Sequence, residues 1–246
     1  MPGNNRVAVS GGAGRRSGGG RITPVPCIRV LCRRALAMSL RQVVLTASLF
    51  SIVAGFPART AAASKEFDFK DPKGVNSIVF VLDSLLEPIM GLANGVSGKL
   101  QFDPADPQST RGTIALAASS VKCAHAGMTN VLHGDDWMNV KAYPTVEFTF
   151  KKIKDAKPGE DGSVAMTVVA DLTLKGVTKE LEVPVSATYL AGQLGQRVRG
   201  KDGDLLVLRS TFSVKRRDFG IKPEMGPETV AEEIELRVSI VGIRPE

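Results

Sequence analysis

The sequence predicts an all-β fold in which roughly eight antiparallel strands close into a barrel or stack as a sandwich. Three observations lead to this prediction. After Ser64 the apolar residues recur with a period of two, which is typical of strands that bury one face. Gly- and Pro-containing turn signals separate the alternating runs, and the connections between them have the length of hairpins. No internal repeat or long linker divides residues 64–246, so one domain is expected there.

The alternation is cleanest in three segments of the chain. Val146, Phe148 and Phe150 alternate with polar residues, and the same pattern covers residues 180–189 and 233–240. Less regular runs predict further strands at residues 76–83, 113–119, 163–174 and 205–214. Turns are expected at residues 71–74, 103–107, 158–162, 175–176 and 202–203.

One segment departs from the strand pattern. Met128, Val131, Leu132 and Met138 recur near helical spacing, with Trp137 beside them. A short helix or two turns over residues 128–140 is therefore predicted, packed over an opening of the sheet.

The N-terminal 63 residues are predicted to be a basic extension followed by a secretory signal peptide. Met38-Ser-Leu-Arg41 precedes an apolar run at residues 43–56, and three alanines end at Ala63, where cleavage is expected. A run of about 14 residues is shorter than the roughly 20 needed to span a bilayer as a helix, so no stable membrane span is expected. The Arg-rich stretch before Met38 suggests that Met38 is the true start, and an organellar transit peptide is the competing interpretation. The mature domain, residues 64–246, is thus expected in the periplasm or outside the cell.

Removing this leader changes the charge of the molecule. The whole chain has 32 Lys and Arg against 25 Asp and Glu, a net charge of +7. Nine of the arginines precede Ser64 and no acidic residue does, so residues 64–246 carry 23 cations and 25 anions, a net charge of −2. The sequence therefore gives no electrostatic reason to expect a nucleic-acid partner.

Catalytic motifs are scarce in the mature domain. Cys123 is its one cysteine, and His125 and His133 are its two histidines. On a strand Cys123 and His125 would share a face, which could form a thiolate–imidazole pair or, with His133, bind a soft metal. A buried structural thiol and a rim histidine are the simpler interpretation, because no Cys-x-x-Cys or paired-histidine motif accompanies them. No metal or catalytic residue is therefore assigned, and no enzymatic activity is expected.

Two charged clusters have both functional and structural interpretations. Asp135-Asp136 could bind a cation, or could lie in a solvated turn or at a helix N-terminus, where the dipole favours negative charge. Lys215-Arg-Arg-Asp218 could meet an anionic headgroup, or could hold a structural Arg–Asp pair after a strand.

Three ordered segments resemble the YceI-like family of polyisoprenoid-binding proteins. They are residues 132–148, with Gly-Asp-Asp-Trp and Tyr-Pro; residues 171–179, with Lys-Gly-Val-Thr-Lys; and residues 212–221, with Arg-Arg-Asp-Phe-Gly-Ile. The likeness extends from about Phe67 to Ile243.

This resemblance implies an eight-stranded antiparallel, lipocalin-like β-barrel that holds an isoprenoid chain or a similar long-chain amphiphile in an apolar cavity, with no cofactor. Arg216 and Asp218 match family positions and are the polar candidates, either for a headgroup or for structure. The residues expected to line the cavity are Phe80, Leu82, Leu116, Met128, Leu132, Trp137, Phe148, Phe150, Met166, Val168, Phe212 and Ile221.

The chain departs from the family pattern in its first strand and before its helix. Asn76 and Asp83 stand where the family commonly carries histidines, and Met128-Thr129 stands where it often has Arg-Asp. These changes affect any headgroup contact but not the apolar interior. The alternatives to a carrier are a thiol- or metal-dependent enzyme using Cys123, His125 and His133, and a stress-related interaction module. A sheet edge left open could also pair two copies as a homodimer.

Overall fold

The computed structural model describes residues 64–71 and 73–246. The predicted leader, with Met38, the apolar run at 43–56 and the cleavage after Ala63, lies outside these residues. Within them, no helix combines the length and apolar character needed to cross a membrane.

In the described part of the chain, eleven strands form one antiparallel sheet. They are β1 (Lys65–Asp68), β2 (Ser77–Ser84), β3 (Ile89–Ala93), β4 (Val96–Phe102), β5 (Arg111–Ala117), β6 (Val121–Cys123), β7 (Thr145–Pro158), β8 (Ser163–Leu174), β9 (Val177–Leu190), β10 (Gly203–Lys215) and β11 (Val230–Pro245). The helices are α1 (Ala126–His133) and α2 (Leu194–Arg197), with 3₁₀ turns η1 (Pro107–Ser109), η2 (Ala118–Ser120), η3 (Glu160–Gly162) and η4 (Arg216–Phe219).

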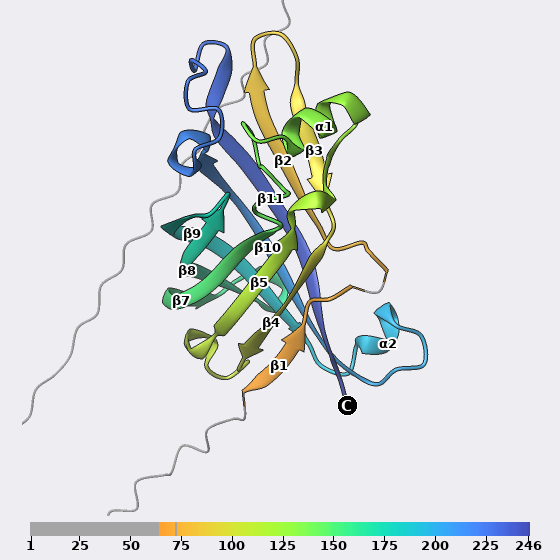
Figure 1. Ribbon diagram of the computed structural model, residues 1–246. Helices are drawn as coiled ribbons and strands as arrows, with labels where there is room; N and C mark the ends of the chain where they lie inside the picture. The colour runs from red at the N-terminus through yellow and green to blue at the C-terminus, as the bar shows by residue number, and fades with distance from the viewer. Residues whose placement is uncertain (1–63, 72) are drawn as a thin grey trace, which may run out of the picture. The chain divides into compact units, whose positions relative to one another are not determined.

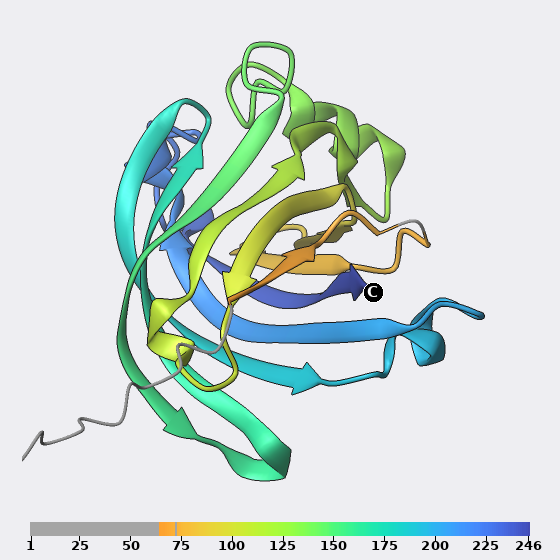
Figure 2. The same ribbon diagram turned by 90° about the horizontal axis from the view of Figure 1, so that it is seen from below.

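The sheet closes into a barrel of eight strand positions, as predicted. Both β1 and β2 pair with β11, β1 pairs with β4, and β2 pairs with β3, so β1 and β2 act as one interrupted strand and β3 and β4 as the next. The third position is shared by β5 and β6, and β7 to β11 complete the ring. Figure 2 shows the strands curving around a central space. In Figure 1, β2, β3 and α1 lie at one end, and β1, α2 and the C-terminus lie at the other.

Most strands lie where the alternation placed them, while several are longer than predicted. The predicted run at 146–150 extends to the 14 residues of β7, and the run at 233–240 extends to the 16 residues of β11. The predicted Lys175-Gly176 turn joins β8 to β9, and both residues have positive φ angles, of 50° and 76°. Two consecutive left-handed residues are what a type I′ hairpin requires, and the glycine accepts this conformation without strain.

The helical segment is shorter than predicted and begins earlier. A helix or two turns were expected over residues 128–140, whereas α1 begins at Ala126 and ends at His133. The Gly134 N–H bonds to the carbonyl oxygen of Val131, and Asn139 has a φ of 45°, so residues after 133 form turns. These turns still bury Trp137 and Met138 against the sheet.

The barrel end near β1 is densely packed. Phe67, Phe69, Leu100 and Leu206 have no exposed surface. Asp204, 3% exposed, holds this end together by accepting hydrogen bonds from the Lys65 ammonium at 2.7 Å and the Tyr189 hydroxyl at 2.9 Å. Packed side chains thus fill the barrel at this end.

Candidate ligand cavity

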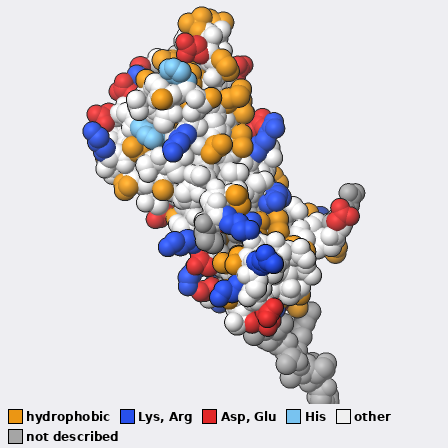
Figure 3. Space-filling view, turned by 90° about the vertical axis from the view of Figure 1, so that its right-hand side faces the viewer, with side chains coloured by type: hydrophobic (Ala, Val, Ile, Leu, Met, Phe, Trp, Pro, Cys, Tyr) orange, Lys and Arg blue, Asp and Glu red, His pale blue; other side chains and the backbone are white. Residues whose placement is uncertain are grey.

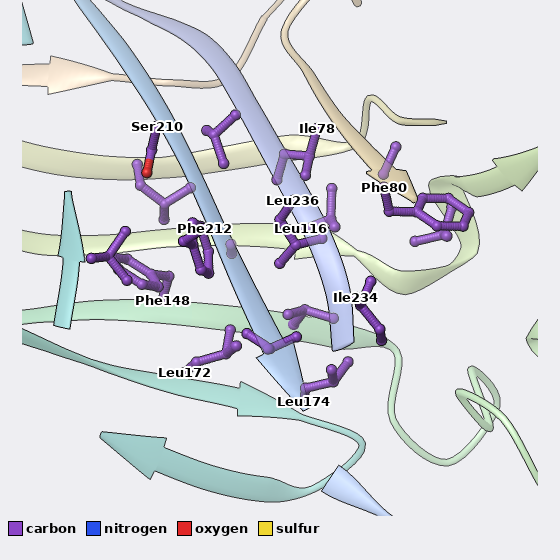
Figure 4. A pocket seen from close by; sticks show the side chains of 18 of the residues that line it. Ile78, Phe80, Leu116, Phe148, Leu172, Leu174, Ser210, Phe212, Ile234 and Leu236 are labelled. Carbon is purple, nitrogen blue, oxygen red and sulfur yellow. The ribbon is translucent and has the colours of Figure 1, made fainter. Parts of the chain in front are cut away.

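A cavity of about 190 Å³ lies inside the barrel, and its wall is almost wholly apolar. Three adjacent strands supply matching layers, because the register of β11 sets Leu236 beside both Phe212 and Phe80. One layer on, Val238 lies beside Ser210 and Ile78 by the same register. Figure 4 labels Ile78, Phe80, Ser210, Phe212 and Leu236 around this space.

Three of the aromatic rings that line the cavity lie close to one another. Phe148 on β7 makes an edge contact with Phe150, with ring centres 5.4 Å apart, and lies 6.3 Å from Phe212 on β10. Phe148, Phe212 and Leu236 line the cavity yet remain only half-buried, because an empty volume faces them. Side chains that point into a barrel keep solvent-accessible surface only where the interior is not filled, so this part of the barrel is hollow.

A second hollow, the mouth groove, lies at the α1 end. Its volume is about 560 Å³, and it is bounded by the β2–β3 hairpin, α1 and the loop before β11. Ile89, Leu132 and Trp137 line both the interior cavity and the mouth groove. These three side chains therefore form the boundary between the two.

Most of the predicted lining residues are where the sequence placed them. Those that line the interior cavity are Phe80, Leu82, Leu116, Leu132, Trp137, Phe148, Phe150, Phe212 and Ile221. Met128 lines the mouth groove instead. Met166 and Val168 line neither hollow and are a correction to the prediction: at 4% and 0% exposure they are enclosed by packed neighbours, which leave no space beside them.

The prediction omitted part of the wall. Ile78, Leu208, Ser210, Val214, Ile234, Leu236, Val238 and Ile240 all line the cavity. Those on β11 belong to the alternating face at 233–240, so following that face along the strand would have identified them.

Arg216 is a structural residue in this fold. It has no exposed surface, and its guanidinium donates hydrogen bonds to the backbone carbonyl oxygens of Ala231, Ile221, Lys222, Met225 and Val230. Asp218 is exposed, and the structure shows no ion pair between it and Arg216, so the structural Arg–Asp pair that the sequence left as one interpretation is not formed. Arg216 instead fixes the loop that walls the mouth groove.

Two lysines join the turns at the rim. The Lys222 ammonium lies 2.7 Å from the Asp136 carboxylate, and this hydrogen bond lowers the pKa of Asp136. The Lys175 ammonium donates to the backbone carbonyl oxygens of Asp136 and Gly220, at 3.0 and 2.7 Å. Asp136 thus takes part in structural contacts between the turns.

The substituted positions of the first strand lie away from the cavity lining. Asn76 is 1% exposed, and its amide nitrogen donates to the carbonyl oxygens of Phe69 and Val241. Its amide oxygen accepts from the Val241 N–H and from Arg197, both at 2.9 Å. Asp83 is exposed, and neither residue lines either hollow.

The thiol and histidines lack the surroundings of a reactive centre. Cys123 is buried, and burial raises the pKa of its thiol, which disfavours the thiolate. His133 Nε2 lies 2.7 Å from the carbonyl oxygen of Val121, at the edge of β6. Among residues 64–71 and 73–246, no three His, Cys, Asp or Glu side chains are grouped so that they could hold a metal.

Comparison of the sequence with known proteins identifies the family of this barrel. The YceI-like domain model matches residues 71–242. The chain belongs to the YceI-like domain family. A UPF0312 protein of Pseudomonas paraeruginosa is 30% identical over 200 residues, which cover 80% of this chain and 97% of that protein.

Solved structures show the same YceI-like fold. BcnA of Burkholderia cenocepacia matches with a TM-score of 0.52 at 21% identity, covering 68% of this chain and 95% of BcnA. A polyisoprenoid binding domain from Saccharophagus degradans matches with a TM-score of 0.53 at 11% identity, covering 74% of this chain and all of that domain.

Proposed function

We propose that this YceI-like barrel binds the apolar chain of a polyisoprenoid or similar long-chain amphiphile, and carries or sequesters it without chemical change. The observation that carries the proposal is the cavity wall, in which Ser210 supplies the one hydroxyl among otherwise hydrophobic side chains. Moving an apolar chain from water into such a space gains about 0.8 kcal/mol per CH₂ group. The polyisoprenoid binding domain that shares this fold supports the same class of ligand.

The sizes of the two hollows suggest how a long chain would lie. Small-molecule pockets usually measure about 300–1,000 Å³, so the interior cavity of about 190 Å³ holds only part of a long ligand. The remainder would pass Trp137 into the larger mouth groove. There Ser84, Glu87, His125 and Thr229 supply polar groups, beside which a headgroup avoids the cost of complete desolvation.

Trp137 offers a direct test, because it is the chain's one tryptophan and lines both hollows. We expect farnesol, a fifteen-carbon isoprenoid alcohol, to change its fluorescence saturably at one equivalent per chain. The matched control is farnesol added to free tryptophan at the same concentration. A change that is absent, or that grows linearly without saturating, would contradict the proposal and favour an interaction module with an incidental cavity.

The enzymatic alternative has no comparable support. Cys123 is buried, and His133 is engaged with a backbone carbonyl group.

We also propose that the working molecule is exported and begins near Ser64, on the strength of the leader sequence alone. N-terminal sequencing of protein from a periplasmic or culture fraction tests this, and an intact N-terminus on cytoplasmic protein would contradict it.

A further inference from the structure

Exposed apolar side chains are concentrated on one hairpin of the barrel. Eight large hydrophobic residues are strongly exposed in the described part of the chain, and five of them lie on the β2–β3 hairpin. We call these five the hairpin patch: Val79, Leu85, Leu86, Met90 and Leu92. Clustered exposed apolar surface of this kind marks a contact site rather than ordinary surface variation.

The tip of the hairpin is its most exposed part. Leu85 and Leu86 follow the end of β2 and are 75% and 83% exposed. Val79 and Leu92 are cross-strand partners on the outer face of the hairpin, and Met90 lies opposite Val81 on the same face. In Figure 1 the hairpin reaches the far end of the barrel, and Figure 3 shows hydrophobic side chains gathered at that end.

The hairpin patch is continuous with the path to the cavity. Leu86 lines the mouth groove, and the groove shares Trp137 with the interior. A surface that covered the hairpin tip would therefore adjoin the opening through which an apolar chain must pass. If that surface were itself apolar, the chain would not have to enter water during transfer.

The charge of the hairpin indicates which surface this is. Between residues 77 and 93 the ionisable side chains are Asp83 and Glu87, with no Lys or Arg. Docking on anionic lipids normally depends on Lys and Arg beside the membrane. The strands that flank the hairpin do carry cations, since Lys122 pairs with Leu92 and Arg237 with Val79, but both lie away from the tip, which has no cation of its own. Insertion of apolar side chains into the boundary between headgroups and acyl chains requires none.

We propose that the β2–β3 hairpin docks the barrel on a lipid bilayer of zwitterionic character, with the leucine tip inserted and the mouth groove facing the acyl chains. This inference rests on the proposed function, because docking would serve the passage of an apolar chain between the bilayer and the cavity. The contact itself is measurable without any ligand.

The test is flotation of the isolated protein with phosphatidylcholine vesicles. The variant Leu85→Ser/Met90→Ser removes two exposed side chains that line neither hollow. We expect wild type to float with the vesicles and the double variant to bind about tenfold less or weaker still, from the apolar area lost. Adding phosphatidylglycerol should not strengthen the binding.

Val75→Ser is the matched control. Val75 is 60% exposed but precedes β2, whereas Leu85 follows it, so an eight-residue strand of roughly 26 Å separates them. The control should bind vesicles like wild type. All proteins compared share one N-terminus, so any membrane contact made by the apolar run at 43–56 would be equal in each.

Several results would overturn the inference. They are equal flotation of wild type and double variant, no flotation of wild type, or binding that depends on phosphatidylglycerol. A concentration-dependent dimer that the double variant loses would assign the hairpin patch to a second copy of the chain instead, which light scattering detects.

Failure of the docking can be told apart from failure of the proposed function. Farnesol added from ethanol should change Trp137 fluorescence equally in wild type and in Leu85→Ser/Met90→Ser. If that titration works while flotation fails, the docking is wrong and ligand binding stands. If flotation behaves as expected and the titration fails in both proteins, ligand binding is wrong and the docking stands.

Discussion

The hydroxyl of Ser210 donates a hydrogen bond to the backbone carbonyl oxygen of Pro184, with 2.5 Å between the two oxygens. Ser210 is the one hydroxyl-bearing residue in the cavity wall. Its hydroxyl proton is already used in the bond to Pro184 and is not available to a ligand. A ligand in the cavity is therefore offered almost purely apolar contact. This arrangement favours hydrocarbon chains over polar molecules of the same size, which would lose hydrogen bonds to water on entry.

Filling the cavity should abolish binding without harming the fold. Val238→Phe adds a ring from β11 into the hollow, so we expect affinity for farnesol to fall at least about tenfold as apolar contact area is lost. The free energy of unfolding should stay constant or rise by up to about 1 kcal/mol, because a void is filled. Trp137 fluorescence and urea unfolding measure the two effects. Ser239→Phe, on the exposed side of the same strand, is the control, and equal binding loss in both variants would contradict the account.

Arg216 and Asp218 should differ sharply in their effect on stability. Arg216→Met leaves several buried carbonyl oxygens without a donor, so we expect a loss of about 3 kcal/mol or more in the free energy of unfolding. Asp218→Asn changes an exposed side chain and should shift it by less than about 0.5 kcal/mol. Urea unfolding of both variants checks this. Similar losses in the two would mean that Asp218 has a structural role that the geometry does not show.

Asp204 should make stability depend on pH in the acid range. Burial acts to raise the pKa of its carboxyl, but hydrogen bonds from Lys65, the Gly192 N–H and Tyr189 outweigh burial and lower it to about 2. A lowered folded-state pKa contributes stability above the unfolded value near 3.8 and loses it as the pH falls toward 2. The contribution at neutral pH is about 2 kcal/mol.

The measurement is thermal or urea unfolding between pH 5 and pH 2. Wild type should lose more stability over this interval than Asp204→Asn, which lacks the titrating group. Asp83→Asn removes an exposed carboxylate and should follow wild type. Parallel pH profiles for wild type and Asp204→Asn would contradict the assignment.

Cys123 should behave as an inert core thiol. Because it is buried and burial raises its pKa, iodoacetamide should label it slowly in the native protein and rapidly in urea. Cys123→Ser should leave farnesol binding unchanged. Mass spectrometry of labelled protein follows the rate. Rapid labelling of the native protein at neutral pH would revive the thiol-enzyme hypothesis.

The alternation of side chains predicted the barrel because each long strand buries one face and exposes the other. Four strands, β1, β3, β4 and β6, were not predicted, because their three to seven residues show no clear alternation of apolar and polar side chains. Their pairing is set by long-range register, such as β1 with β11, which local sequence does not encode.

The sequence predicted which side chains point into the barrel, but not which of them line the cavity. Phe148 and Val168 both alternate inward, yet Phe148 faces the cavity while Val168 is fully packed. Whether an inward side chain faces the cavity or is fully packed depends on the distance between opposite walls of the barrel, which the sequence pattern does not give. The sequence singled out Arg216 as a polar candidate but did not decide between a headgroup contact and a structural role. The structural role became clear only from the fold, because the five carbonyl groups that accept its hydrogen bonds lie on residues 221–231, in the loop that follows it and at the start of β11.

The most direct test of ligand binding is native mass spectrometry of the protein mixed with a long-chain polyprenol, with Val238→Phe measured in parallel. The account predicts a one-to-one complex with wild type and little or none with the filled variant. Absence of any complex, or equal complex formation by both proteins, would contradict the claim that the barrel interior binds the chain.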